Sequence, residues 1–224
     1  MSDVFISYSR KDSAFVHKLN DALAQQNRDV WVDWEDIPLT SEWWDEICRG
    51  IEATDTFVFV ISPDSVMSSV CRDEVNHAVK HNKRFIPLLH RDLVTDEHKE
   101  NAHPVIGSHN WIFIREDDDF DQAFESLVNS IDTDLEYIRE HTRLLLRARQ
   151  WQEEEYDITE LLTGTDIRDS ERWLEENKHK EPPPTELHHS YVAASRQAAA
   201  RRQRVLGAGV AALIALVGMF IAVL

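Results

Sequence analysis

The chain has 224 residues, which is enough for one ordinary domain and part of a second. It carries 41 Asp and Glu residues against 24 Lys and Arg residues, a formal charge of -17. This acidic excess argues against a nucleic-acid partner, which would need a basic face. Two cysteines are too few for a disulfide framework. The glycines before residue 200 are too widely spaced for a glycine-rich phosphate or dinucleotide loop, so any nucleotide that binds here must be held in another way.

Residues 1–132 alternate short apolar runs with amphipathic stretches. We expect strands at 4–6, 30–32, 57–61, 85–89 and 111–114, and helices at about 13–26, 41–53, 69–82 and 119–131. Continuous apolar strands that alternate with helices are typical of an α/β fold, here a five-stranded parallel sheet covered on both faces. Ligands of such folds bind at the carboxyl ends of the strands, where the following loops emerge.

Residues 133–181 carry no strand signal, and their spacing predicts a helical extension with helices at 135–155 and 166–177. Three consecutive prolines end that region at 182–184. We expect residues 182–204 to form a proline-containing linker and a juxtamembrane helix.

Residues 205–224 form an uncharged apolar run, and a helix of this length covers about 30 Å, the thickness of a bilayer core. The run predicts one transmembrane helix and the membrane as a partner. Arg201, Arg202 and Arg204 come directly before it and no basic residue follows, so the body is expected on the cytoplasmic side of a single-pass protein. The first residues show no signal-peptide pattern, which agrees with that orientation.

Five motifs occur in order at the expected strand and loop positions: 4–12 (VFISYSRKD), 30–37 (VWVDWEDI), 43–47 (WWDEI), 57–63 (FVFVISP) and 69–74 (SVCRDE). Together they resemble a Toll/interleukin-1 receptor (TIR) domain of bacterial type over about residues 1–131. The resemblance implies a flavodoxin-like fold and self-association through the TIR domain. Small residues at four-residue spacing within 207–215 offer the membrane helix as a second route, although an alanine-rich apolar composition explains them equally well.

TIR domains of one class are interaction modules, and those of another class cleave the nicotinamide–ribose bond of NAD+. The enzymatic class is similar to this chain in carrying a glutamate on the helix after the Ser-Pro turn, which is Glu74 here. The resemblance implies an NAD+ hydrolase that releases linear or cyclised ADP-ribose, with NAD+ as substrate and no cofactor, acting as a membrane-anchored effector in bacterial immune signalling. A non-enzymatic scaffold that assembles partners at the membrane stays open as the alternative.

The position of Glu74 is unusual on its own terms. It lies on a helical stripe with Val70 and Ala78, where periodicity predicts a core or boundary residue. A carboxylate there is costly unless it is paired or functional, so it either pairs with a base such as Arg10 or Lys11 or performs chemistry. One carboxylate is sufficient for NAD+ cleavage because nicotinamide leaves as a neutral molecule and needs no general acid. The residues alone favour the ion pair, and it is the TIR resemblance that makes Glu74 the predicted catalytic residue.

The predicted substrate-binding residues lie on the loops after the strands. A cation after the first strand can meet a pyrophosphate, and a tryptophan can stack on a base, although core packing is an equal alternative for each tryptophan. The set is Tyr8, Ser9, Arg10, Asp33, Trp34, Glu35, Trp44 and Ser62.

Two histidines, His77 and His81, lie four residues apart on the same predicted helix as Glu74. That spacing can mimic a metal site, but the sequence offers no evident third strong ligand, so we predict no metal. Cys71 lies on the apolar stripe and is expected to be a small core residue.

Overall fold

The computed structural model describes residues 3–34 and 41–223, with side chains for all of them except 41, 42 and 209–223. The chain forms two compact units, Met1–Arg143 and Leu144–Leu224, and the division falls inside helix α8. Each unit has its own core, and each is described by itself.

The first unit is built on a five-stranded sheet in which all neighbouring strands are parallel, in the order β2-β1-β3-β4-β5. This confirms the predicted α/β fold with five parallel strands. The order places β1 and β3 at the centre, where every residue is buried. The strands are β1 (Val4–Ser7), β2 (Val30–Trp31), β3 (Thr56–Ile61), β4 (Arg84–Leu89) and β5 (Ile112–Phe113).

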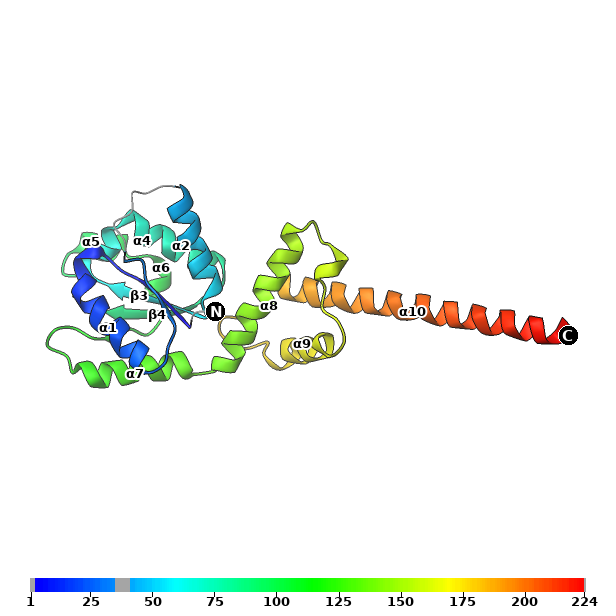
Figure 1. Cartoon of the computed structure of the whole chain (residues 1–224). Helices are drawn as coiled ribbons and strands as arrows, with labels where there is room; N and C mark the ends of the chain where they lie inside the picture. The colour runs from blue at the N-terminus through cyan, green and yellow to red at the C-terminus, as the bar shows by residue number, and fades with distance from the viewer. Residues whose placement is uncertain (1–2, 35–40, 224) are drawn as a thin grey trace. The chain divides into compact units, whose positions relative to one another are not determined.

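Helices cover both faces of this sheet (Figure 1), because alternate side chains of each strand point to opposite faces. Helices α1 (Ser13–Gln25) and α7 (Phe120–Asp132) pack on the face that carries Val4, Ile6 and Val58. Helices α2 (Ser41–Ala53) and α4 (Ser69–Lys80) pack on the opposite face, which is rich in phenylalanine. Because helices cover both faces, side chains that point to either face are buried, and this accounts for the uninterrupted apolar runs of the strands.

Short helices fill the connections on the carboxyl side of the sheet. They are η1 (Arg10–Asp12), α3 (Pro63–Met67), α5 (Asp96–Asn101) and α6 (Pro104–Gly107). Helix α3 begins with a reciprocal cap, in which the Ser62 hydroxyl accepts from the Ser65 amide and the Ser65 hydroxyl accepts from the Ser62 amide. Helix α4 follows directly and is capped by Ser68, whose side chain accepts from the Cys71 amide. This pair of caps fixes where α4 starts and so which of its residues face β1.

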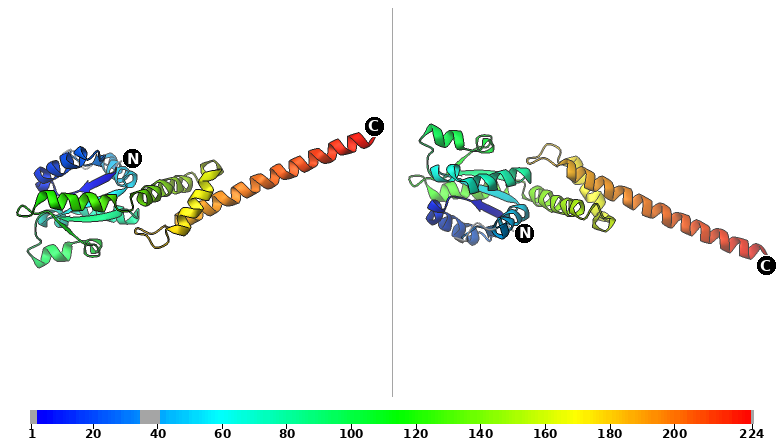
Figure 2. Two further views of the ribbon diagram at one scale, coloured as in Figure 1. Left: turned by 90° about the horizontal axis from the view of Figure 1, so that it is seen from below. Right: turned by 90° about the horizontal axis from the view of Figure 1, so that it is seen from above.

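The second unit is helical. It contains the end of α8 (Leu135–Glu153), the turn η2 (Ile158–Glu160), α9 (Thr165–Glu176) and α10 (Glu186–Val223). Its core gathers Leu144, Trp151, Leu162, Ile167 and Tyr191. Figure 2 shows α10 as one continuous helix. Among the residues with described side chains, no helix is both long enough and apolar enough to cross a membrane. Most of the predicted span at 205–224 lies outside those residues.

Candidate active site

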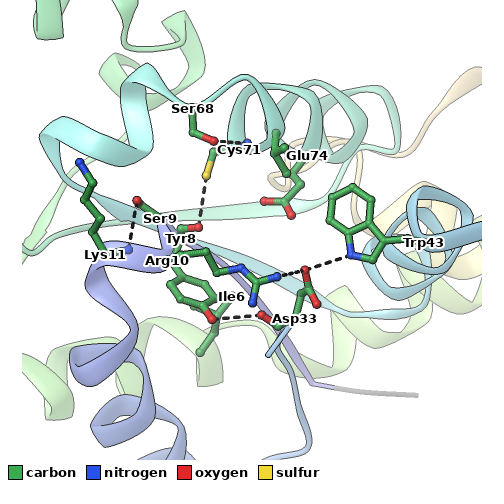
Figure 3. A pocket seen from close by; sticks show the side chains of 11 residues that line it. Ile6, Tyr8, Ser9, Arg10, Lys11, Asp33, Trp43, Ser68, Cys71 and Glu74 are labelled. Atoms are coloured by element: carbon green, nitrogen blue, oxygen red, sulfur yellow. Dashed lines mark hydrogen bonds and ion pairs between the residues drawn. The ribbon is translucent and has the colours of Figure 1, made fainter. Parts of the chain in front are cut away.

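A pocket of about 450 Å³ opens at the carboxyl edge of the sheet, beside the end of β1 (Figure 3). Loops after β1 and β2 form one side, and helices α2 and α4 form the other. Its volume lies in the range of sites that take small molecules. The lining residues are Ile6, Tyr8, Ser9, Arg10, Lys11, Asp33, Trp43, Ser68, Val70, Cys71 and Glu74.

Glu74 is the buried acid of this pocket, with 5% of its surface exposed. It shares the buried face of α4 with Cys71, Val75 and Ala78, which pack against the sheet. The last residue of β1, Ser7, donates a hydrogen bond of 2.5 Å from its Oγ to Glu74 Oε2. The helix therefore carries Glu74 to the end of β1, where the pocket begins.

Burial raises the pKa of Glu74 to about 8, because the surroundings replace the water that would solvate a charged carboxylate. The hydrogen bond from Ser7 lowers this pKa and offsets only part of the rise, while the charges of Asp33 and Arg10 act in opposite directions. At neutral pH the empty pocket thus favours the neutral acid. A positive charge that enters the pocket would favour the carboxylate.

Asp33 organises the wall opposite Glu74. Its Oδ2 accepts from Arg10 Nη2 at 2.7 Å and from Trp43 Nε1 at 3.2 Å, and its backbone carbonyl accepts from the Tyr8 hydroxyl at 3.0 Å. Asp33 thereby holds a cation, an indole ring and a phenol around one side of the pocket. The Arg10 side chain remains 41% exposed, so the guanidinium can meet a ligand from solvent.

Cys71 lines the pocket, but its thiol is suited to packing. Its Sγ donates to the Tyr8 carbonyl at 3.3 Å, and burial raises its pKa to about 12. A thiol in this state is a poor nucleophile. The expectation of a small core residue is confirmed, since Cys71 is 2% exposed.

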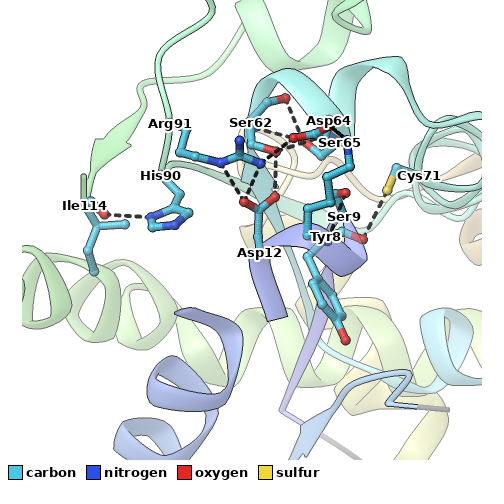
Figure 4. A network of polar contacts seen from close by, with 11 residues as sticks. Tyr8, Ser9, Asp12, Ser62, Asp64, Ser65, Cys71, His90, Arg91 and Ile114 are labelled. Atoms are coloured by element: carbon cyan, nitrogen blue, oxygen red, sulfur yellow. Dashed lines mark hydrogen bonds and ion pairs between the residues drawn. The ribbon is translucent and has the colours of Figure 1, made fainter. Parts of the chain in front are cut away.

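A polar network ties together the loops behind the pocket (Figure 4). Arg91 donates from Nε to Asp12 and from Nη2 to Asp64, both at 2.7 Å, and Ser62 Oγ donates to Asp12 Oδ2 at 2.6 Å. Lys11 pairs with Asp64 at 2.5 Å and so joins the pocket rim to the network. These contacts link the ends of β1, β3 and β4, and the pKa of Asp64 is held low mainly by its hydrogen bonds from Lys11 and Arg91.

The structure brings together five residues of the predicted set, and three others, Trp34, Trp44 and Ser62, lie elsewhere. Glu74, Tyr8, Ser9, Arg10 and Asp33 line the pocket. The ring of Trp34 stacks on that of His17 with the ring centres 4.0 Å apart. The ring of Trp44 is tilted against Trp43 and lies edge-on to His77. Ser62 is fully buried, where it caps α3 and bonds Asp12. Glu35 lies outside the described residues.

Sequence reasoning did not select Trp43, which lines the pocket, or Ser7, which donates a hydrogen bond to Glu74, and only Trp43 carried a signal. Trp43 is the first member of the buried stripe Trp43, Ile47 and Ile51, whose four-residue spacing directs it inward. Trp44 is rotated by about 100° from it around the helix, which accounts for its place outside the pocket. Ser7 carried no signal, because it reads as the last residue of a buried strand.

Among the described residues, Glu52, His77 and His81 form the group whose side chains could hold a metal ion. Glu74 is not a member, because it faces Ser7 on β1 whereas the histidines face Glu52 on α2.

A parallel sheet covered on both faces, with a pocket at the carboxyl ends of its strands, defines a doubly wound α/β domain. The TIR domain family model matches residues 4–128, more than half of the chain, so the chain belongs to the TIR domain family. This match supports the TIR domain and not the narrower bacterial type. No curated protein matches the chain.

Several solved structures are similar to part of this chain. The TIR domain of the Toll-related receptor TRR-2 from Hydra magnipapillata is 19% identical, with a TM-score of 0.47, and the match covers 58% of this chain and 98% of that one. A metazoan TIR-STING receptor from C. gigas is 19% identical, with a TM-score of 0.46 and coverage of 58% and 39%. The heterodimer of the RPS4 and RRS1 TIR domains is 20% identical, with a TM-score of 0.46 and coverage of 58% and 96%.

Proposed function

We propose that the pocket around Glu74 cleaves the nicotinamide–ribose bond of NAD+ and that the protein is an NAD+ hydrolase. The observation that carries the proposal is the buried carboxyl group of Glu74, whose pKa is raised to about 8, beside a pocket of about 450 Å³. Perturbed acids in clefts are candidates for catalytic groups. Residues that serve only to fold the domain have no need of a carboxyl group at this position.

The chemistry requires one carboxylate. NAD+ carries a positive charge on its nicotinamide ring, and placing that ring beside Glu74 favours release of the Glu74 proton. The bond from ribose C1′ to the ring nitrogen then breaks, and its electron pair neutralises the ring, so nicotinamide leaves without a proton. The carboxylate stabilises the positive charge that develops on the ribose. Water adds to C1′, loses a proton and gives ADP-ribose.

The other pocket residues have chemically matched roles in this proposal. The exposed guanidinium of Arg10 is placed to pair with the pyrophosphate, for which Arg offers two parallel donors. The Trp43 indole, fixed by its bond to Asp33, offers a face for a base or the nicotinamide ring. Tyr8 and Ser9 line the same pocket.

The setting of this activity rests on the sequence and on the TIR family. The apolar run at 205–224 and the preceding arginines support a single membrane anchor with the TIR domain in the cytoplasm. A role as an immune effector follows from the TIR resemblance. The alternative, a scaffold without activity, gives no functional reason for the buried carboxyl group of Glu74.

Two substitutions on adjacent residues of α4 test the proposal. Glu74→Gln keeps the size of the side chain and its acceptor for Ser7, so the fold should persist while nicotinamide release falls at least about 1000-fold, the scale expected for losing a principal stabilising group. Asp73→Asn removes the exposed neighbouring carboxylate and should retain activity within about threefold.

Nicotinamide release would be measured by chromatography, with circular dichroism to verify folding. Wild-type turnover in a folded Glu74→Gln protein would overturn the assignment of this site. No release by the wild-type chain, even when it is concentrated on vesicles, would favour the scaffold.

A further inference from the structure

Helices α2 and α4 carry matched pairs of polar side chains on the faces they turn toward each other. Cys48 and Glu52 lie four residues apart on α2, and His77 and His81 lie four residues apart on α4. Residues at this spacing share one helix face. Both helices cover the same face of the sheet, so the two pairs meet between them.

Both histidines point at the same oxygen atom. Nε2 of His77 lies 2.8 Å from Glu52 Oε1, and Nε2 of His81 lies 3.6 Å from it. The two imidazole rings stack with their centres 4.1 Å apart. One ligand atom from each of the three residues lies within 4.8 Å of the others. A tetrahedral zinc ion with bonds of about 2.0–2.2 Å needs ligand atoms about 3.4 Å apart, so small side-chain movements suffice to admit it.

The charge of the cluster also suits a metal ion. Glu52 supplies a carboxylate between the two imidazole rings, and His81 is almost fully buried, where a cation needs such a partner. The nearby cation of Lys83 is held by the backbone carbonyls of Glu52 and Thr54.

Cys48 supplies the kind of outer contact that orients a metal-binding histidine. Its Sγ lies 3.6 Å from His77 Nδ1, on the side of the ring away from Glu52. A proton on Nδ1 that is shared with Cys48 leaves Nε2 with a lone pair for the metal. Cys48 therefore orients the His77 ring through Nδ1, while the metal binds at Nε2.

We infer that Glu52, His77 and His81 form a binding site for a divalent transition metal, with Zn²⁺ the best-matched ion, and that the metal cross-links α2 to α4. Two imidazoles and one carboxylate are a known zinc ligand set, and a water molecule completes the coordination. On α4 the histidines lie three and seven residues after Glu74, and on α2 Glu52 lies nine residues after Trp43. The site therefore ties together the two helices that form one side of the pocket.

The test uses the full chain, purified without a polyhistidine tag and treated with a chelator. Zn²⁺ affinity would be measured by competition with a chromophoric chelator, and the ligand environment by the visible absorption of bound Co²⁺. We expect one ion per chain, no displacement by excess Mg²⁺, which prefers oxygen ligands, and a higher melting temperature with Zn²⁺ than without it.

Glu52→Gln and His77→Gln, at partly exposed positions, should each lower the affinity at least about 10-fold and alter the Co²⁺ spectrum. The matched controls Glu46→Gln, exposed on α2, and His189→Gln, exposed on α10, should leave both unchanged. Cys48→Ser should retain one bound ion. The proposal is overturned if wild type binds no Zn²⁺ at micromolar concentrations, if Glu52→Gln and His77→Gln bind like wild type, or if only Cys48→Ser loses the ion.

Discussion

At the scale of single residues, the environment of Glu74 decides which protonation state is available. Its carboxyl group is buried between α4 and the end of β1, and its hydrogen bond from Ser7 stabilises the charged form only in part. The group is thus close to the balance point between acid and carboxylate near neutral pH. A cationic substrate is the type of ligand that would move this balance toward the carboxylate.

The raised pKa of Glu74 has a consequence for stability. A carboxyl group whose pKa rises from 4.5 in the unfolded chain to about 8 in the folded chain keeps its proton on folding below pH 4.5. Between these values the unfolded chain loses the proton first, so stability falls as pH rises through this window and levels off above about pH 8. Gln cannot ionise and avoids this loss.

We therefore predict that Glu74→Gln is more stable than wild type at about pH 9 and nearly equal to it at about pH 4.5. The gain is at most a few kcal/mol, since one pKa unit corresponds to about 1.4 kcal/mol. Urea unfolding at both pH values would measure it. A difference that is constant with pH would contradict the raised pKa.

Sequence reasoning reached part of the site at this scale. Glu74 could be predicted from the sequence because its carboxylate interrupts an apolar helical stripe. The choice of Trp44 over Trp43 neglected the stripe formed with Ile47 and Ile51. Glu52 could not be joined to His77 and His81 from the sequence, because 25 residues separate Glu52 from His77 and only the packing of α2 on α4 brings them together.

At the scale of elements, the strands and long helices followed from periodicity, and the connections did not. The predicted strands agree with β1 to β5 within one residue at each end, because each is an apolar run and the runs of β1, β3 and β4 are buried almost throughout. The short helices α3, α5 and α6 were not predicted. They depend on local caps such as Ser62, Thr95 and His103 more than on an apolar stripe.

The contact between α2 and β2 is close enough to require glycine. A Cβ atom at Gly50 would lie 2.7 Å from Cε2 of Trp31, and that ring is stacked on Phe5 with ring centres 4.6 Å apart. We predict that Gly50→Ala destabilises the protein by about 1–3 kcal/mol, because overpacking outweighs the better helix propensity of alanine.

Gly107→Ala is the matched control, since nothing lies within 4 Å of the added Cβ. It should change the free energy of unfolding by less than about 0.5 kcal/mol. Thermal melts of both variants would decide the question, and equal melting temperatures would show that Trp31 yields to the added methyl group.

At the scale of the whole molecule, charge opposes the association that the TIR resemblance implies. Residues 196–224 contain 4 of the 24 basic residues and none of the 41 acidic ones, so residues 1–195 carry 20 - 41 = -21. Such a charge disfavours association in dilute, low-salt solution. Confinement to a surface raises the local concentration and can populate a weak contact between TIR domains.

We predict that the chain without its apolar run shows little NAD+ cleavage when dilute and gains activity steeply when it is clustered on beads or vesicles. Added salt should lower the density at which activity appears, because it screens the negative charge. Specific activity would be compared over about a hundredfold range of concentration. Equal activity throughout, with the protein monomeric, would rule out the dependence on association.

The central claim, that the Glu74 carboxylate acts in NAD+ cleavage, is tested most directly by the pH profile of kcat/KM for nicotinamide release. This parameter reports the ionisation of the free enzyme. The account predicts a rise with pH that has its inflection near the pKa of Glu74, about 8, and an inflection at higher pH for Ser7→Ala, which removes the hydrogen bond that lowers this pKa. A profile without an inflection between about pH 6 and about pH 9.5 would contradict the account, and so would an inflection whose pH is unchanged in Ser7→Ala.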